Sequence, residues 1–142
     1  MKRTPNFEIF IDGASRGNPG PAGVGAVCFN GSDAPLWQVS RYIGETTNNV
    51  AEYLALIYAL SEAQRRGQTD VAVKTDSQLL ARQLSGQYKV RDPRLQLLHQ
   101  LASRLLKTFG SVEVVHIPRE QNALADKLAG QAVRGRRPAA AK

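Results

Sequence analysis

The sequence contains very few of the residues that form covalent or metal cross-links. Cys28 is its only cysteine, and there are only two histidines among 142 residues. One cysteine cannot form an internal disulfide or a zinc site made of several thiolates. A chain without disulfides is typical of a reducing compartment. The chain must therefore fold by burying apolar surface, and 142 residues are enough for one domain with a single core.

Long apolar runs are also missing. The most apolar stretch, Val50 to Leu60, contains Glu52 and is too short to cross a bilayer. The first residues, Met1-Lys2-Arg3, are not followed by the apolar segment of a signal peptide. We therefore expect a cytoplasmic, monomeric protein that does not contact membranes.

Acidic residues are outnumbered by basic ones. There are 12 Asp and Glu against 19 Lys and Arg, which gives a net charge of +7. A basic surface attracts polyanions, so nucleic acid is the first class of partner to consider. Part of the excess lies near the C-terminus, at Arg134, Arg136, Arg137 and Lys142. Residues 135–142 have no apolar period, which predicts a basic, disordered tail after a domain of residues 1–134.

Apolar periodicity predicts an alternation of strands and helices. The expected strands cover residues 6–12, 23–29, 36–43, 71–75 and 112–117. The expected helices cover residues 50–66 and 78–84, run from Pro93 towards Gly110, and begin again near Asn122. Ser77 and Asp92 are expected to cap the second and third helices. The stretch 13–21, GASRGNPGP, has too many glycines and prolines to be expected in a regular element.

This order of elements predicts an α/β domain. The first three strands should form an antiparallel meander, since Asn30-Gly31 is a hairpin signal. Right-handed crossovers would make the first, fourth and fifth strands parallel and adjacent. Ligands of such sheets bind at the carboxyl ends of the parallel strands, where Asp12 and Asp76 are expected to lie.

Four acidic residues occupy unusual positions. Asp12 and Asp76 end strands, while Glu52 and Asp126 are expected in the first turns of helices. Each has a purely structural alternative. The two aspartates could begin turns, Glu52 could complete a capping box with Asn49, and Asp126 could favour the positive end of its helix.

The predicted topology nevertheless gathers these acids at one edge of the sheet. Converging carboxylates repel one another and raise each other's pKa values, so the pattern predicts bound cations. Ligation by oxygen alone suits Mg²⁺ or Mn²⁺, and two such ions could assist phosphodiester hydrolysis. In a basic protein this indicates a nuclease.

Four stretches of the sequence resemble the type 1 ribonuclease H family: IDGASRGNPGPAG, TTNNVAEYLAL, KTDSQ and NALADKLA. The resemblance covers roughly Phe7 to Val133. It implies the ribonuclease H-like fold, a five-stranded mixed sheet flanked by helices on both faces. It further implies endonucleolytic cleavage of the RNA strand of RNA–DNA hybrids, largely without sequence preference. The acids that it marks as ligands of two Mg²⁺ ions, or of Mn²⁺ as a substitute, are Asp12, Glu52, Asp76 and Asp126.

The resemblance also implies a set of substrate contacts. Thr47 matches a position near a DNA-strand phosphate, and the positions that match contacts to the minor groove of the hybrid are Asn18, Asn48, Asn49 and Gln78. Neutral amides suit this task because they can pair with the 2′-hydroxyl of RNA without reading sequence. Capping and turn formation are the structural alternatives for these residues.

The chain departs from many bacterial family members in two places. Ser85 to Arg94 is too short for their basic, Trp-rich protrusion, and Pro118 to Asn122 replaces their histidine-containing loop. Arg119 in this loop is our candidate for holding or releasing a phosphate. His116 is expected to be packed at the end of its strand, and His99 to lie far from every motif.

Two other functions stay open on sequence grounds. One is a nuclease for a different duplex, such as double-stranded RNA or branched DNA. The other is a nucleic-acid-binding module without catalysis. Four intact acids argue against the second, because a binder gains nothing from negative charge beside phosphates.

Overall fold

The computed structural model describes residues 7–136. Its elements follow the predicted order, with one short 3₁₀ helix, η1, added before the last helix. They are β1 (Phe7–Ser15), β2 (Gly20–Phe29), β3 (Trp37–Thr46), α1 (Asn48–Arg65), β4 (Asp70–Thr75), α2 (Gln78–Leu84), α3 (Pro93–Leu106), β5 (Ser111–His116), η1 (Arg119–Gln121) and α4 (Ala123–Arg134).

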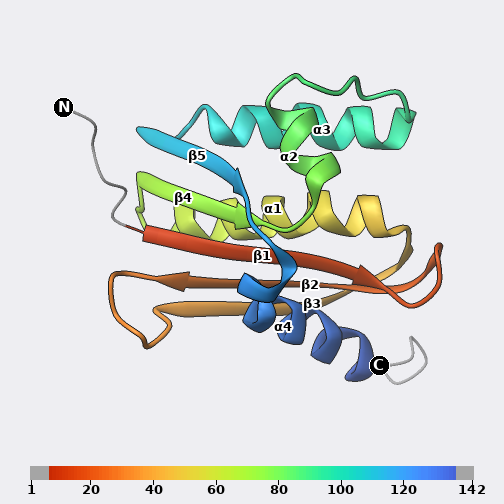
Figure 1. The fold of residues 1–142 in the computed structure, drawn as a ribbon, viewed down its shortest axis with the longest axis horizontal. Coiled ribbons are helices and arrows are strands. Elements are labelled where there is room, and N and C mark those ends of the chain that lie inside the picture. Colours follow the sequence, from red (N-terminus) through yellow and green to blue (C-terminus); the bar gives the residue numbers. More distant parts are fainter. Residues whose placement is uncertain (1–6, 137–142) are drawn as a thin grey trace.

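The strands form one mixed sheet in the order β3-β2-β1-β4-β5 (Figure 1). β1, β2 and β3 pair antiparallel, whereas β4 pairs parallel with both β1 and β5. This confirms the predicted meander and the predicted adjacency of the three parallel strands. β3 and β5 are the two edge strands of this sheet.

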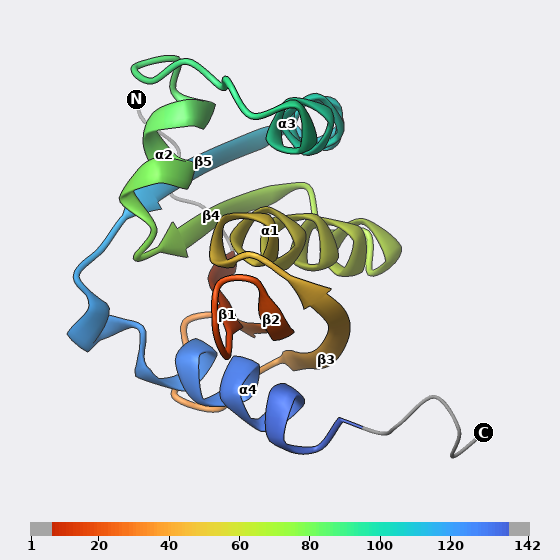
Figure 2. The same cartoon turned by 90° about the vertical axis from the view of Figure 1, so that its right-hand side faces the viewer.

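Helices cover both faces of the sheet, as Figure 2 shows. On one face α1 packs against the sheet, where Ile9 and Ile11 of β1 share a buried cluster with Leu56 and Leu60 of the helix. α3 packs on α1, on the side away from the central strands. α4 lies on the opposite face, against β1, β2 and β3.

The predicted irregular loop at residues 13–21 is wrong in extent. β1 continues to Ser15 and β2 begins at Gly20, so only residues 16–19 connect them. Gly13 lies inside β1 because a Cβ at this position would overlap the backbone of Ala51 and Glu52 in α1. Close approach of a helix therefore overrides the low strand propensity of glycine here.

The caps of the helices are partly as expected. Ser77 caps α2 by accepting a hydrogen bond from Leu80 N at 3.1 Å, and Asp92 caps α3 by accepting from Arg94 N at 2.8 Å. The structural alternative for Glu52, a capping box with Asn49, is excluded. Thr47 is the N-cap of α1, and Glu52 lies one turn further along, where its carboxylate has a different partner.

Two other expectations concern the end of the chain. His116 is exposed, which contradicts the prediction of a packed histidine, because it ends β5, an edge strand in which no residue is fully buried. The tail prediction falls mostly on residues 137–142, which lie outside the described residues. Gly135 and Arg136 directly follow α4, and Arg136 Nη1 donates a hydrogen bond to Val133 O at 2.8 Å.

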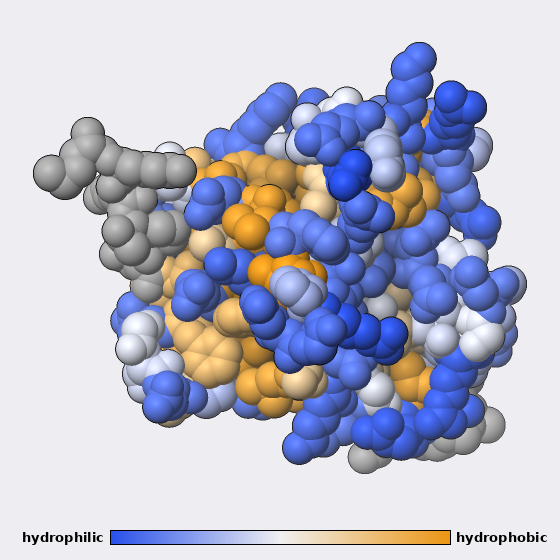
Figure 3. Space-filling view, in the orientation of Figure 1, coloured by the Kyte–Doolittle hydropathy of each residue, from blue (hydrophilic) through white to orange (hydrophobic). Residues whose placement is uncertain are grey.

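The face of the molecule drawn in Figure 3 is mainly hydrophilic, with hydrophobic residues gathered on its left half. A hollow of about 220 Å³ lies beside the start of α4 and is lined by residues that include Phe10, Val27, Phe29 and Leu124. Among the described helices, none has the length and hydropathy required to span a bilayer.

Candidate active site

Asp12 lies inside β1, where its side chain is only 5% exposed. The strand is central in the sheet, with β2 on one side and β4 on the other. A carboxylate at such a position is costly to desolvate unless it is protonated or paired with a cation. The position of Asp12 therefore needs an explanation beyond turn formation, which is excluded because the strand continues for three residues after it.

Glu52 reaches the same region from α1. Its Oε1 accepts a hydrogen bond from the backbone N–H of Gly13, at 2.8 Å. Glycine is required at position 13, because a Cβ there would overlap the carbonyl carbon of Ala51 and the nitrogen of Glu52. The close approach of β1 and α1 thus fixes the Glu52 carboxylate beside Asp12.

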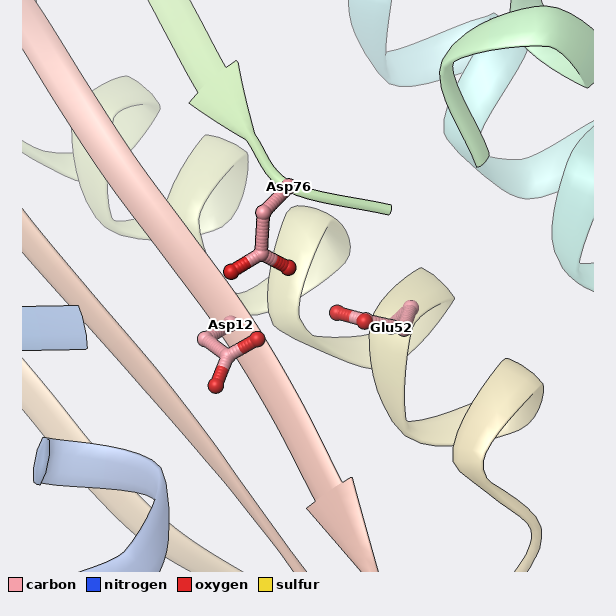
Figure 4. Close-up of side chains that lie close together, drawn as sticks. All are labelled: Asp12, Glu52 and Asp76. Carbon is pink, nitrogen blue, oxygen red and sulfur yellow. The ribbon is translucent and has the colours of Figure 1, made fainter. Parts of the chain in front are cut away.

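Asp76 follows the last residue of β4 and completes a group of three acids. One carboxylate oxygen from each of Asp12, Glu52 and Asp76 lies within 4.8 Å of the others. Figure 4 shows the three carboxylates directed toward one another from two strands and one helix. Asp76 Oδ2 also accepts a hydrogen bond from Asn122 Nδ2, at 3.2 Å.

The fourth acid, Asp126, lies in the first turn of α4, as predicted. It is not part of the tight group of three, but it lines the same hollow of about 480 Å³. Arg119 lines this hollow as well. The structure therefore brings all four predicted acids and the predicted arginine to one depression, with Asp126 and Arg119 on the side formed by η1 and α4.

The crowding of these carboxylates changes their affinity for protons. Burial, together with the charges of Glu52 and Asp76, raises the pKa of Asp12 from 3.8 to about 9. Burial also raises the pKa of Glu52 to about 8, although the Gly13 N–H and the charge of Arg119 act in the opposite direction. Without a cation, both groups therefore retain their protons to a higher pH than isolated carboxyl groups do.

A divalent cation fits this site better than protons do. The available donors are carboxylate oxygens, the ligands that hard cations such as Mg²⁺ and Mn²⁺ prefer. Bound positive charge would remove the repulsion that raises these pKa values. The donor set and its electrostatics thus match a divalent metal.

Three of the predicted substrate residues form a polar border beside the acids: Asn18, Thr47 and Asn48. Asn48 Oδ1 accepts hydrogen bonds from Ser15 N at 3.0 Å and from Ser15 Oγ at 2.9 Å. The backbone N–H of Asn48 donates to Asn18 Oδ1 at 3.0 Å, so these two predicted residues are in contact. Thr47 immediately precedes Asn48 and is the N-cap of α1.

Asn49 and Gln78 are exposed on the first turns of α1 and α2. Neither lines the hollow that contains the acids. Both lie at the ends of helices that begin near it, since Gln78 follows Asp76 by two residues and Asn49 precedes Glu52 by three.

Two residues that shape the site were not predicted from the sequence. Gly13 was treated as part of a turn, whereas its N–H orients Glu52. Asn122 was treated as the start of a helix, whereas its side chain contacts Asp76. The sequence signal for both is their place inside motifs that also carry a predicted acid, but the contacts themselves depend on the tertiary fold.

Comparisons with known proteins indicate the family of this chain. The sequence model of a family described as reverse transcriptase-like matches residues 10–132. A ribonuclease HI of Halobacterium salinarum is 44% identical over 131 residues, which cover 92% of this chain and 66% of that protein. The crystal structure of RNase H1 from this archaeon has a TM-score of 0.88 at 42% identity, covering 92% of this chain and 98% of the solved chain.

Two further relatives are similar over most of this chain. A bifunctional protein of Mycobacterium tuberculosis is 44% identical over 126 residues, 88% of this chain but 35% of its own length. The structure of its N-terminal RNase H domain has a TM-score of 0.85 at 43% identity, covering 89% of this chain and 98% of the solved one. The structure of LC11-RNase H1 in complex with an RNA/DNA hybrid has a TM-score of 0.85 at 44% identity, covering 90% and 96%.

The chain spans about a third of the length of the mycobacterial protein and about two thirds of the length of the archaeal one. The family model, by contrast, matches most of this chain, and the solved ribonuclease H structures are covered almost completely. Together with the mixed sheet and the acidic cluster, these matches show that the chain belongs to the type 1 ribonuclease H family.

Proposed function

We propose that this chain is a metal-dependent endonuclease that cleaves the RNA strand of RNA–DNA hybrids. The observation that carries the proposal is the convergence of Asp12, Glu52 and Asp76 within 4.8 Å in a ribonuclease H fold. A solved relative at 44% identity was crystallised with an RNA/DNA hybrid, which supports the same substrate here. The net charge of +7 favours encounter with such a polyanion.

The four acids are proposed to hold two Mg²⁺ ions, for which Mn²⁺ would substitute. When bound, such ions supply positive charge to the phosphate oxygens and lower the pKa of an attacking water. Asp12 and Asp76 are the residues that we expect to be least replaceable, because they come from adjacent parallel strands and face each other across the group.

Other residues of the chain have supporting tasks in this proposal. The Gly13 N–H keeps the Glu52 carboxylate directed at Asp12 and Asp76. Arg119 lines the hollow, so its guanidinium can hold the phosphate that is cleaved or released. This assigns to a fixed charge the task that a titrating histidine performs in other family members.

The polar border is proposed to recognise the hybrid. Asn48 uses its Oδ1 to accept from Ser15, and within the described part of the chain its Nδ2 donates no hydrogen bond. This Nδ2 is therefore available to a ribose 2′-hydroxyl or a base edge in the minor groove. Asn18, Thr47, Asn49 and Gln78 would extend the contact along both strands. Since none of these groups reads a unique base pattern, cleavage should be largely independent of sequence.

A cleavage assay with three labelled duplexes of the same sequence tests the proposal: an RNA–DNA hybrid, double-stranded DNA and double-stranded RNA. With Mg²⁺ or Mn²⁺, we expect cuts in the RNA strand of the hybrid, no cuts in double-stranded DNA, and none in any duplex when EDTA is present. An Asp76→Asn variant serves as the control for contaminating nucleases. Faster cleavage of double-stranded RNA than of the hybrid would identify a different substrate, and no cleavage by a folded, metal-loaded protein would refute the proposal.

A further inference from the structure

Asn122 is almost completely buried, with 1% of its surface exposed, although it joins two elements at the edge of the site. Its backbone connects η1 to α4. The N–H of Asn122 donates to Arg119 O at 2.9 Å, and its carbonyl accepts from Asp126 N at 3.1 Å. The backbone of Asn122 is therefore hydrogen-bonded to both Arg119 and Asp126 and fixes their positions relative to each other.

The side chain of Asn122 points in another direction, to the strands. Its Nδ2 donates to Ile11 O at 2.8 Å and to Asp76 Oδ2 at 3.2 Å. Both partners are acceptors, so the amide nitrogen must occupy this position, and the reverse orientation would place Oδ1 against two oxygens. The amide thus joins the backbone of β1, one residue before Asp12, to the carboxylate that follows β4.

The usual reason for an asparagine before a helix does not apply here. Asn122 occupies the N-cap position of α4, but its side chain makes no capping hydrogen bond. Its Oδ1 is buried without a hydrogen-bond partner in the described structure. A buried, unpaired oxygen lowers stability, so selection for folding alone would favour a residue whose polar atoms are all satisfied. Groups that break this rule are concentrated at functional sites.

We propose that Asn122 is a positioning residue for the metal site. Through its Nδ2 it holds the Asp76 carboxylate at a fixed place relative to Asp12, and through its backbone it holds Asp126 and Arg119 against the same strands. Groups that hydrogen-bond to a metal ligand orient that ligand without touching the metal themselves. This inference rests on the proposed function, because it assumes that the acids hold a cation.

The test measures metal binding without substrate, through the rise of the melting temperature Tm as Mg²⁺ or Mn²⁺ is added. The variants are Asn122→Ala and Asn122→Ser, so that one can be used if the other does not fold. Val133→Ala is the control, since Val133 is buried on the same helix but does not line the hollow with the acids. It should lower the metal-free Tm without changing the site.

We expect both Asn122 variants to require a metal concentration about tenfold higher than the unmodified chain, or more, to reach half of the maximal rise in Tm. Val133→Ala should need the same concentration as the unmodified chain. In the cleavage assay, the Asn122 variants should have a lower kcat that excess metal partly restores, with little change in KM for the hybrid, because Asn122 is buried away from the substrate surface.

The outcomes separate this inference from the proposed function. An unmodified chain that responds to metal, together with Asn122 variants of equal metal requirement, would overturn the inference alone. The same conclusion would follow if Val133→Ala raised the requirement as much as Asn122→Ala. An unmodified chain whose Tm does not respond to either metal would overturn the proposed function and the inference together.

Discussion

Gly13 and Glu52 are joined by a hydrogen bond of 2.8 Å between the strand backbone and the helix carboxylate. Residue 13 follows Asp12 directly, so the strand that supplies one acid also orients a second one. The contact depends on the absence of a side chain at position 13, because a Cβ would overlap the first turns of α1. The geometry of the acidic group is therefore set by the backbone approach of β1 to α1.

We predict that Gly13→Ala strongly reduces both metal binding and turnover. The added methyl group must push α1 away from β1, since the atoms that it meets belong to the backbone of Ala51 and Glu52. Gly31→Ala is the control, because Gly31 has a φ of 73° but nothing within 4 Å of an added Cβ. It should cost about 1 kcal/mol of stability, from backbone strain, and leave turnover unchanged. Normal turnover in Gly13→Ala would show that the contact with Glu52 is dispensable.

Asp76→Asn should abolish cleavage and leave the fold intact. The substitution removes one of the three carboxylates that lie within 4.8 Å of one another, so the metal-free Tm should be unchanged or higher. Cleavage of a labelled hybrid with Mg²⁺, and melting curves in EDTA, measure the two effects. A clear fall of Tm in EDTA would mean that this carboxylate stabilises the fold instead.

The stability of the metal-free protein should fall as the pH rises from about 4 to about 9. The folded pKa of Asp12 is about 9, above its ordinary value of 3.8, so its protonated form favours the folded state. This contribution is complete below pH 3.8 and is lost as the pH approaches the folded pKa. A single group of this kind can change the free energy of unfolding by up to about 1.4 kcal/mol per pH unit within that window.

The control for this pH dependence is Asp12→Asn, which cannot titrate. Denaturation in EDTA at several pH values should show that it gains stability over the unmodified chain as the pH rises. In the unmodified chain, the rise of Tm caused by Mg²⁺ should grow over the same range, because metal binding displaces the protons. Parallel pH curves for the two proteins would contradict the raised pKa of Asp12.

Arg119→Ala should lower turnover severalfold or more, because it removes the positive charge that lines the acidic hollow. Arg119→Lys should retain part of the activity, since it keeps the charge but loses the planar donor pair. His116→Ala is the matched comparison from the neighbouring strand end. Since His116 is exposed, its loss should change stability by less than about 0.5 kcal/mol. Normal turnover in Arg119→Ala with a large loss in His116→Ala would reverse the assignment.

Replacing Arg137 and Lys142 by glutamine should weaken binding of the hybrid at low salt if the C-terminal charges contact phosphates. Each contact that is lost should reduce the slope of log affinity against log salt by about 0.7 to 0.9. The turnover at saturating substrate should not change. An unaltered salt slope would exclude these two residues from the substrate interface.

The fold was largely predictable from local patterns, and the site only in part. Turn and cap signals such as Asn30-Gly31 and Asp92-Pro93 depend only on residues that are close in sequence, so they can be recognised without knowing the tertiary fold. Gly13 misled the prediction of a loop, because its role is to let β1 approach α1 closely rather than to end the strand. The prediction for His116 was wrong because alternation alone does not show how little of β5, an edge strand, is buried. The four acids were found through their motifs, whereas the hydrogen bonds of Gly13 and Asn122 join residues that are distant in sequence.

The hydrogen bond from Asn122 to Ile11 O joins positions 111 residues apart. During synthesis the first strand leaves the ribosome long before the segment that completes the site. The acids of β1, α1 and β4 can therefore approach one another early, but the η1–α4 segment can close the site only when nearly the whole domain is available. A chain that is released prematurely, before residue 122, would have three of the four acids. It would lack Asp126 and the hydrogen bond from Asn122 to Asp76. Acquisition of metal affinity should thus be one of the last events in the maturation of this protein, and a sensitive signal that its C-terminal helix has docked.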